Sequence, residues 1–313
     1  MSMLTITLIA PPSPFLTEPK AYPPLGLLYL AAALRKECKD IKIDILDLSD
    51  KVRIKKIEGD LVGFSVTTPQ INRTKEIIER NVEDAKVILG GPHPTALPYE
   101  TLYNGDVWAV VRGYGERMLP LIVNNFKNYS FIEKFYLSDF FTDVKDLDWL
   151  PMPAWDLLDL HSYKPEIEGG KAMNIYTSRG CPYDCNFCTT KIYCHKKVWF
   201  HSPERVLEEV KILKNKYEFD AFVIGDDNFL LDSARVKKIC GLLGQEQVKF
   251  RCIGRVNHIT QEVAKVLKEA GCTEISFGIE SGSNKMLKIM NKKATAELAE
   301  KVVKICKEAG LIV

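Results

Sequence analysis

The feature that most constrains the fold is a regular alternation of short apolar runs with segments of helical period. The first 113 residues contain five such runs, at residues 3–10, 41–48, 61–66, 85–91 and 106–113. Apolar runs joined by helices are typical of parallel strands that are buried on both faces. The pattern predicts an α/β fold that begins with a doubly wound, five-stranded parallel sheet, with a ligand at the carboxyl ends of its strands.

The loops after these strands are rich in Gly, Pro, Ser and Thr, as binding loops often are. The candidate binding residues in them are Leu25, Gly26, Ser65, Thr67, Thr68, Gly90, Gly91, His93, Gly113 and Glu116. Ordinary turns are the alternative, because Gly–Gly, Gly–Pro and Thr–Pro pairs all form turns. A nicotinamide site is disfavoured, because the first loop has one glycine and no G-x-G-x-x-G motif.

A second alternating series begins at residue 171, after a linker over residues 131–170. Four strands are expected within residues 173–179, 220–228, 248–256 and 273–281, with a helix after each. The tetrapeptide KEAG ends two of these helices, at Gly271 and Gly310, where a left-handed C-cap glycine is expected. The series predicts an incomplete parallel βα barrel over residues 171–313, following a first domain over residues 1–130. Because the last three residues open a fifth strand, we expect the chain to lack the final barrel units.

Three cysteines lie within eight residues, directly after the first strand of the second series: Cys181, Cys185 and Cys188. A disulfide needs two cysteines and a structural zinc site needs four ligands. Three thiolates leave one iron of a cubane iron–sulfur cluster open, and an open iron can bind a substrate. A zinc site completed by Cys194 or His195 is the alternative.

The other cysteines are expected to be ordinary thiols. Cys194 is read as a loop thiol, with an auxiliary role as the alternative. Five more cysteines lie in predicted helices or strands, or at their edges, and we expect them in the core. They are Cys38, Cys240, Cys252, Cys272 and Cys306.

The segment "CPYDCNFC" fits the pattern CxxxCxΦC, with Phe187 as Φ, and resembles that of radical S-adenosylmethionine (SAM) enzymes. The resemblance continues after the later strands, in "GDDN" and "GIESGS". It implies a [4Fe-4S] cluster on the three cysteines and SAM on the open iron. The residues that it implies for SAM are Gly225, Asp226 and Asp227 at the amino group, Glu280 and Ser281 near the ribose and carboxylate, and Arg255 at the carboxylate. A surface ion pair is the alternative for Arg255.

The N-terminal half resembles the cobalamin-binding domain of the B12-dependent branch of that family. The segments "PPLGLLYLAAALR", "GGPHPTALP", "VRGYGE" and "DLDWLPMPAWDLL" match in order. The loop residues named above are then implied to face cobalamin. The Asp-x-His-x-x-Gly motif of other cobalamin proteins is absent, so the resemblance implies a base-off cofactor, and His93 is not assigned as a cobalt ligand.

Taken together, the resemblances imply an enzyme that reductively cleaves SAM to a 5′-deoxyadenosyl radical and methylates an unactivated carbon or phosphorus of a small molecule. They also imply an electron donor such as flavodoxin or ferredoxin. The alternatives are a cyclase, a rearrangement or oxidation enzyme, and a truncated cobalamin-binding module without turnover.

The charge and hydropathy of the sequence limit the binding partners and the cellular compartment that we expect. The net charge of +2 gives no indication of nucleic acid or an anionic membrane as partner. The longest apolar run, residues 25–34, is too short to span a membrane and lacks the basic flank of a signal peptide. We therefore expect a cytoplasmic protein, in which clustered cysteines indicate metal binding or catalysis.

Overall fold

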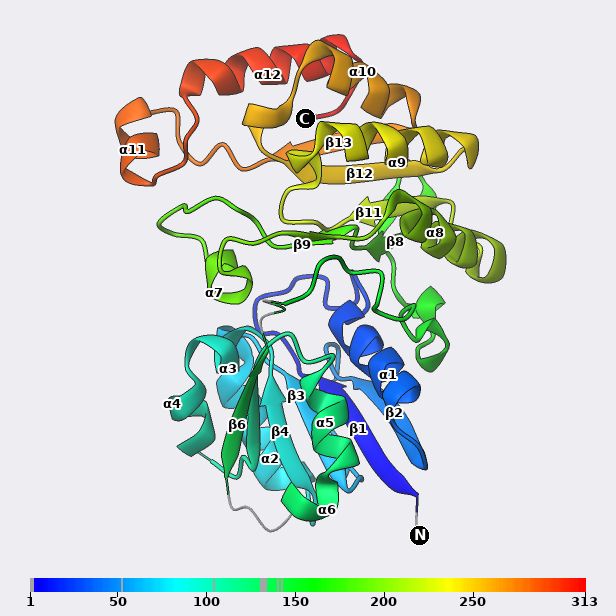
Figure 1. Ribbon diagram of the computed structural model, residues 1–313, viewed down its shortest axis with the longest axis vertical. Helices are drawn as coiled ribbons and strands as arrows, with labels where there is room; N and C mark the ends of the chain where they lie inside the picture. Colours follow the sequence, from blue (N-terminus) through cyan, green and yellow to red (C-terminus); the bar gives the residue numbers. More distant parts are fainter. Residues whose placement is uncertain (1–2, 52, 104, 130–133, 140, 142) are drawn as a thin grey trace. The chain divides into compact units, whose positions relative to one another are not determined.

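The computed structural model describes residues 3–51, 53–103, 105–129, 134–139, 141 and 143–313 (Figure 1). The chain forms two compact units. Met1–Asp143 and Leu150–Tyr163 make up the first, and Val144–Trp149 and Lys164–Val313 make up the second. Residues predicted as a linker therefore contribute to both units.

The first unit is built on a parallel six-stranded sheet in the order β2-β1-β3-β4-β5-β6. Its strands are β1 (Leu4–Ala10), β2 (Ile41–Asp47), β3 (Leu61–Ser65), β4 (Lys86–Gly90), β5 (Ala109–Gly113) and β6 (Phe135–Asp139). The α/β prediction is confirmed, but the predicted count of five strands was one short. The missed strand, β6, pairs only with β5 at the sheet edge, so it lacks the continuous apolar run of a strand buried on both faces.

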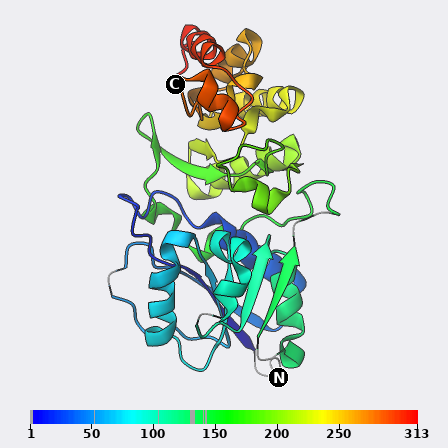
Figure 2. The same ribbon diagram turned by 90° about the vertical axis from the view of Figure 1, so that its left-hand side faces the viewer.

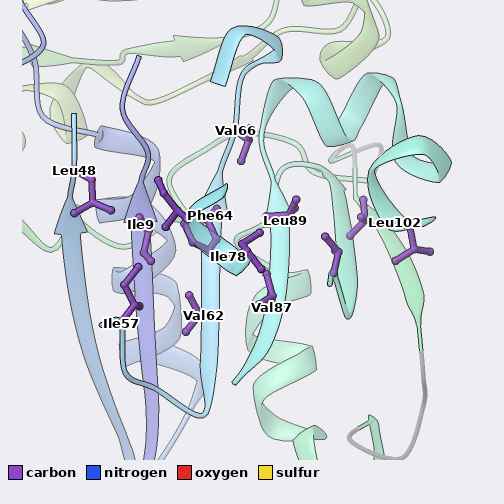
Figure 3. Close-up of a cluster of buried hydrophobic side chains, with 13 residues drawn as sticks. Ile9, Leu48, Ile57, Val62, Phe64, Val66, Ile78, Val87, Leu89 and Leu102 are labelled. Atoms are coloured by element: carbon purple, nitrogen blue, oxygen red, sulfur yellow. The ribbon is translucent and has the colours of Figure 1, made fainter. Parts of the chain in front are cut away.

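Helices cover both faces of this sheet, with α2 on one side and α1 and α5 on the other (Figure 2). The helices are α1 (Leu25–Glu37), α2 (Ile71–Asn81), α3 (Pro92–Ala96), α4 (Pro98–Tyr103), α5 (Met118–Asn124) and α6 (Phe126–Tyr129). On the α2 face, Ile77 and Ile78 pack against Val62 and Val87 from the central strands (Figure 3). Burial of such apolar side chains is the main stabilising contribution to the unit.

The second unit is built on a sheet in the order β13-β12-β11-β8-β7. Its strands are β7 (Glu166–Ile167), β8 (Gly170–Ile175), β11 (Ala221–Ile224), β12 (Lys249–Gly254) and β13 (Cys272–Phe277), and all neighbours are parallel except the β7–β8 hairpin. Ile312 forms a further parallel bridge to Glu274 on β13. The predicted partial barrel is thus present as a half-barrel sheet.

A helix follows each barrel strand, and the sequence signals for their ends are confirmed. The helices are α7 (Thr190–Cys194), α8 (Pro203–Tyr217), α9 (Ser233–Gln245), α10 (Gln261–Glu269), α11 (Asn284–Ile289) and α12 (Ala296–Glu308). The Ser202 side chain caps α8 by accepting a hydrogen bond from the Arg205 N–H, with Pro203 in the first turn. Gly271 and Gly310 follow α10 and α12 with φ of 99° and 80°, so these left-handed positions suit glycine.

Candidate active site

The cysteine loop, residues 180–189, runs between β9 (Ser178–Arg179) and α7 and begins just beyond the carboxyl end of β8. Cys185 is 4% exposed, and Cys181 and Cys188 are half-buried. Gly180 opens the loop with a φ of +92°, and a Cβ there would lie 2.3 Å from the carbonyl oxygen of Lys197. Only glycine fits this entry to the loop.

Two adjacent carboxylates after β11, Asp226 and Asp227, accept hydrogen bonds from residues just before this loop and at its start. Asp226 is 1% exposed and accepts hydrogen bonds from the Thr177 N–H, the Thr177 hydroxyl and the Ser178 hydroxyl, each at 2.6 Å. Asp227 is exposed and accepts from the Gly180 N–H and the Thr190 hydroxyl, each at 3.1 Å. The two acids therefore join the carboxyl ends of β8 and β11.

These contacts bear on the residues predicted for the SAM amino group. Burial raises the pKa of Asp226, although the hydroxyls of Ser178 and Thr177 act in the opposite direction. Both oxygens of each carboxylate accept hydrogen bonds from the chain, but Asp227 is exposed whereas Asp226 is buried. Gly225 lies close to Tyr176, because a Cβ there would come within 2.8 Å of the Tyr176 ring. The assignment of all three residues to SAM stays a prediction.

A buried cation lies beside the cysteine loop. Arg255, at the end of β12, is 7% exposed, and its Nη1 donates to the Cys185 sulfur at 3.3 Å. Its guanidinium stacks on the Tyr183 ring at 3.7 Å from the centroid, and Nη2 donates to the carbonyl of Lys292. The alternative of a surface ion pair is wrong, because the side chain is buried and turned to the loop.

The residues that follow β13 lie at the same edge of the half-barrel sheet. Glu280 has a φ of 69° and forms an ion pair of 3.0 Å with Lys292. The Ser281 hydroxyl accepts from the Ser283 N–H at 3.1 Å. Phe187 from the cysteine loop is 50% exposed, with the Lys292 ammonium 5.7 Å from its ring centroid. The structure thus brings together, at one edge of the half-barrel, the cysteine loop and the residues after β11, β12 and β13.

Three thiols are a donor set that suits an iron–sulfur cluster. Within the described part of the chain, no three His, Cys, Asp or Glu side chains are grouped closely enough to hold a single metal ion. A cubane cluster binds its thiolates on different irons and so holds them further apart. Cys194, the fourth ligand of the zinc alternative, is fully buried, and its thiol donates to the Cys181 carbonyl at 3.4 Å. That contact is the structural role of a loop thiol.

Burial is the main cause of a raised pKa at several of the free thiols. It raises the pKa of Cys181, while the Tyr183 N–H lowers it. Iron binding must therefore displace a proton from this sulfur at neutral pH. The predicted core thiols are buried, and burial raises the pKa of Cys240 to about 12 and that of Cys306 to about 11. Such thiols are protonated and inert.

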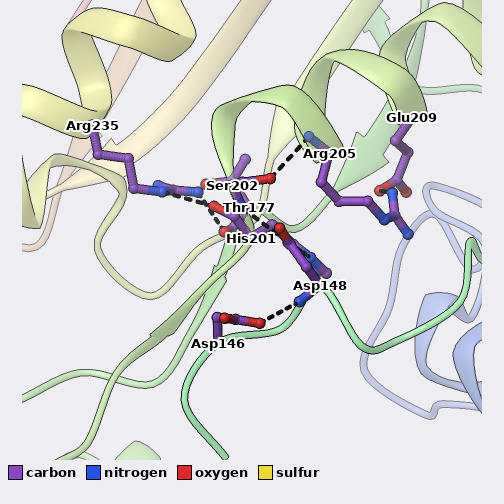
Figure 4. A network of polar contacts seen from close by, with 8 residues as sticks. All are labelled: Asp146, Asp148, Thr177, His201, Ser202, Arg205, Glu209 and Arg235. Carbon is purple, nitrogen blue, oxygen red and sulfur yellow. Dashed lines mark hydrogen bonds and ion pairs between the residues drawn. The ribbon is translucent and has the colours of Figure 1, made fainter.

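A polar network braces the base of the cysteine loop (Figure 4). The Arg235 guanidinium, 8% exposed as a residue, donates to the carbonyls of Thr177 and His201 at 2.5 and 3.1 Å. Asp148 accepts from the Ser202 N–H at 2.9 Å and lies 3.3 Å from Nδ1 of His201. The ends of β8 and β10 (Trp199–Phe200) are thereby fixed to α8 and α9.

The carboxyl edge of the first unit is held mainly by backbone and hydroxyl groups. The Val66 N–H donates to the Gly90 carbonyl at 2.8 Å, and the His93 N–H donates to the Val66 carbonyl at 3.0 Å. The Gly113 N–H donates to the Thr95 hydroxyl at 3.0 Å. The loops after β3, β4 and β5 are thus fastened to one another.

Two glycines at this edge differ in what surrounds them. Gly91 has a φ of +93°, and a Cβ there would lie 2.8 Å from the Val66 nitrogen. Gly26, in the first turn of α1, is exposed, and a Cβ there would meet nothing within 4 Å. Gly91 therefore shapes the loop, whereas Gly26 leaves room for a bound group.

The polar residues of the edge fit cobalamin, which is fringed with amide groups. Ser65 is half-buried, and Thr67 and Thr68 are exposed. His93 is 2% exposed, and its Nδ1 lies 3.2 Å from the Thr68 hydroxyl. In the described chain its Nε2 has no hydrogen-bond partner, and burial lowers the His93 pKa, which keeps the ring neutral. A buried polar atom without a partner indicates a group still to be bound.

The remaining predicted residues occupy less accessible positions. Leu25 is 3% exposed and Glu116 is 4% exposed, so their side chains belong to the interior of the unit. Gly90 and Gly113 are the last residues of β4 and β5. The contacts of all these residues with cobalamin stay predictions.

Comparison with known proteins matches each half to a family. Residues 175–313 match the model "Radical SAM superfamily", and residues 17–123 match the model "B12 binding domain". "Uncharacterized methyltransferase PH0819" of Pyrococcus horikoshii is 32% identical, over 99% of this chain and 73% of its own length. The chain belongs to the cobalamin-dependent branch of the radical SAM superfamily. Its cofactors are those of the two domains, namely a [4Fe-4S] cluster, SAM and cobalamin.

Other relatives of this radical SAM protein are named for different reactions. "Bacteriochlorophyllide d C-8(2)-methyltransferase" of Chlorobaculum tepidum is 26% identical over 80% of this chain and 57% of its own length. "Anaerobic magnesium-protoporphyrin IX monomethyl ester cyclase" of Cereibacter sphaeroides is 25% identical over 93% of this chain and 52% of its own length. The chain thus spans little more than half the length of these two relatives.

Two solved structures share the fold. The cobalamin-dependent radical SAM enzyme OxsB, with aqua-cobalamin and SAM bound, matches 99% of this chain and 48% of its own with a TM-score of 0.79 at 20% identity. The radical SAM methyltransferase TsrM from Kitasatospora setae matches 99% of this chain and 66% of its own with a TM-score of 0.75 at 18% identity. At these identities the likeness concerns the fold alone. None of the helices among the described residues is long and apolar enough to cross a membrane.

Proposed function

We propose that this radical SAM enzyme is a methyltransferase that acts on an unactivated carbon or phosphorus of a small molecule. The observation that carries the proposal is the 32% identity to "Uncharacterized methyltransferase PH0819", because it extends over 99% of the chain. The similarity to "Cytidylyl-2-hydroxyethylphosphonate methyltransferase" of Streptomyces wedmorensis, 24% identity over 94% of the chain, supports phosphonates as a substrate class to test.

In this proposal the half-barrel residues bind and orient. Cys181, Cys185 and Cys188 would each bind one iron of the cluster, which would leave the fourth iron to SAM. Exposed Asp227 receives the SAM amino group, and Glu280 and Ser281 face its ribose and carboxylate. When bound, the cluster and SAM supply one-electron chemistry and cobalamin supplies a methyl carrier. The task of the chain is to hold these groups and to exclude water and oxygen.

In the first unit the proposed cobalamin site is the edge formed by the loops after β1, β3, β4 and β5. Gly26 leaves space for the corrin, and Thr67 and Thr68 present hydroxyls to its amides. The neutral His93 offers Nε2 as a hydrogen-bonding atom rather than as a cobalt ligand.

The deciding experiment follows the methyl group. Protein purified without oxygen and reconstituted with iron, sulfide and cobalamin is given SAM labelled in its methyl group, a reductant such as flavodoxin, and a metabolite extract. We expect 5′-deoxyadenosine together with a labelled product. The triple variant Cys181→Ala, Cys185→Ala, Cys188→Ala should make no 5′-deoxyadenosine. Retention of cleavage in that variant, or stoichiometric zinc without iron in the wild type, would contradict the proposal.

Cyclisation is the second candidate. Its support is the set of relatives named as anaerobic magnesium-protoporphyrin IX monomethyl ester cyclases, one of them 26% identical over 93% of this chain. A cyclase predicts 5′-deoxyadenosine without transfer of the label. Tight cobalamin binding with neither product would instead indicate a module without turnover.

A further inference from the structure

We infer that Arg255 is a positioning residue for the cluster ligand Cys185 and that its charge favours the reduced cluster, rather than binding the carboxylate of SAM. This inference rests on the proposed function, because it requires a cluster on the three cysteines. On this inference, the Arg255 guanidinium is part of the site that accepts the electron.

The guanidinium is fixed from several sides. Nη1 donates to the Cys185 sulfur at 3.3 Å, and the Tyr183 ring lies against its face at 3.7 Å. Nη2 donates to the Lys292 carbonyl, and the Arg255 N–H donates to Oδ1 of Asn228 at 3.2 Å. Tyr183 is itself held by a contact of 2.9 Å between its hydroxyl and Nε2 of His258. A side chain held in this way cannot swing out to a distant anion without breaking these contacts.

Among the described residues, no carboxylate forms an ion pair with Arg255. The nearby carboxylates have other partners: Glu280 is paired with Lys292, and Asp227 accepts hydrogen bonds from Gly180 and Thr190. A buried cation without a counter-ion is costly unless an anion lies nearby. Three thiolates with a cluster are such an anion, and Cys185 places it within hydrogen-bond distance.

Two buried donors, one on Arg255 and one on its partner Asn228, support the same conclusion. Nε of Arg255 and Nδ2 of Asn228 are buried and have no hydrogen-bond partner in the described structure. Buried donors are seldom left unsatisfied, so both indicate an acceptor that belongs to the loaded site. Thiolate and sulfide sulfurs accept hydrogen bonds, and such bonds adjust cluster potentials.

A short segment, residues 289–293, holds the other side of the loop, and we call it the clasp. The Asn186 N–H donates to the Met290 carbonyl at 3.0 Å, and Nδ2 of Asn186 donates to the Ile289 carbonyl at 2.7 Å. Nδ2 of Asn291 donates to the Asp184 carbonyl at 2.7 Å. Arg255 joins the clasp to Cys185, so its side chain also sets where this sulfur lies.

The redox step is a simple addition of one electron to the cluster from a low-potential donor such as flavodoxin. No bond to Arg255 forms or breaks and no proton moves, but the cluster becomes more negative by one charge. A fixed cation at the ligand sulfur stabilises that product more than the oxidised cluster. Removal of the cation should therefore lower the reduction potential.

The test is a redox titration of the reconstituted full chain, followed by the electron paramagnetic resonance signal of the reduced cluster without SAM. For Arg255→Gln we expect about a tenfold fall in the ratio of reduced to oxidised cluster at a fixed potential, which equals about 59 mV for one electron. Arg255→Lys retains the charge and should recover part of the loss. If Arg255→Gln loads no iron, the lysine variant carries the test, with a smaller shift in the same direction expected.

Two control variants separate this effect from others. Arg251→Gln removes the same formal charge from β12, at a half-exposed side chain paired with Glu274. Asn257→Ala removes a hydrogen bond of 2.7 Å to the Lys293 carbonyl in the clasp but no charge. Both should keep the wild-type potential.

The outcomes distinguish the two proposals. An unchanged potential in the Arg255 variants, with about tenfold weaker SAM binding in equilibrium dialysis, would overturn the inference and assign Arg255 to the SAM carboxylate. Failure of the wild type itself to take up iron and sulfide would contradict the proposed function instead.

Discussion

The carboxyl edges of the two sheets are built by different means. In the half-barrel, buried charged side chains hold the loop, with Asp226, Arg255 and Lys292 exposed by 1%, 7% and 7%. In the first unit, backbone groups, threonine hydroxyls and a left-handed glycine hold the loops. An iron–sulfur cluster is bound through iron–thiolate bonds and changes charge in use, whereas cobalamin carries many neutral amides. This difference agrees with the proposal that the cluster binds at the edge of the half-barrel and cobalamin at the edge of the first unit.

The largest effect should come from the buried carboxylate of the half-barrel. Asp226→Ala leaves the hydrogen-bond donors of Thr177 and Ser178 unsatisfied and removes a carboxylate whose charge favours the buried Arg235 guanidinium. We therefore expect a loss of about 3–5 kcal/mol in the free energy of unfolding. Urea unfolding of the metal-free protein measures it. The neighbouring exposed carboxylate provides the control, because Asp227→Ala should cost about 1 kcal/mol or less. Equal losses in both variants would show that buried charge does not hold this edge.

The corresponding change in the first unit is Gly91→Ala. We expect a loss of about 2–3 kcal/mol, because the methyl group would clash with the Val66 nitrogen in addition to the strain of a positive φ. Gly169→Ala is the control, since Gly169 also has a positive φ, 78°, but open space around it. Its loss should be about 1 kcal/mol, measured by the same unfolding assay. A loss at Gly91 no greater than at Gly169 would show that crowding at this loop is unimportant.

A pH effect should distinguish the half-barrel. Burial, and then the charges of Arg205 and Arg179, lower the pKa of His201 from 6.5 to about 3. His201 therefore binds a proton near pH 6.5 in the unfolded chain but only near pH 3 in the folded chain. Because the unfolded chain binds more protons between these values, the free energy of unfolding falls as the pH falls through this range. At about pH 5 the loss is roughly 2 kcal/mol.

The measurement compares unfolding at about pH 7.5 and about pH 5. His201→Gln cannot take up this proton, so the variant should lose roughly 2 kcal/mol less than the wild type between the two values. His195→Gln, at an exposed position, should follow the wild type. If the two variants show the same dependence on pH, His201 is not the group responsible.

The variant with the smallest expected effect on stability, Gly26→Ala, tests where cobalamin binds. Gly26→Ala should raise the free energy of unfolding by up to about 1 kcal/mol, because alanine favours a helix. It should also weaken cobalamin binding in equilibrium dialysis, because the methyl group enters the open space at α1. Gly241→Ala in α9 offers the same helical gain with nothing within 4 Å, and it should leave cobalamin binding unchanged. Equal cobalamin affinity in both variants would show that the corrin does not bind next to Gly26.

Local patterns carried most of the fold prediction. Apolar runs and caps such as Ser202 mark the central strands and long helices, because their signals lie within a few residues. The strand β6 was missed, because Phe135–Asp139 is an edge strand of five residues without a continuous apolar run. The helix α11, with six residues, is too short to show a helical period.

The site was predictable only where its chemistry is local. The three cysteines lie in one loop, so their spacing alone indicates a cluster. The contact between Arg255 and Cys185 joins residues 70 positions apart, and it depends on how β12 lies in the sheet. No sequence signal marks Asn291 or Lys292 as partners of the loop. The position of Tyr183 between two cysteines is the one local hint that was available.

The clasp has a consequence for biosynthesis. Asn291 and the carbonyl that it holds, Asp184, are 107 residues apart. At a translation rate of about 5–20 residues per second, the cysteines leave the ribosome roughly 5–20 s before the clasp does. During that interval the thiols are presented on an unanchored loop, open to stray metals and to oxidation. Delivery of iron and sulfide is therefore best timed after the fourth barrel strand has been made.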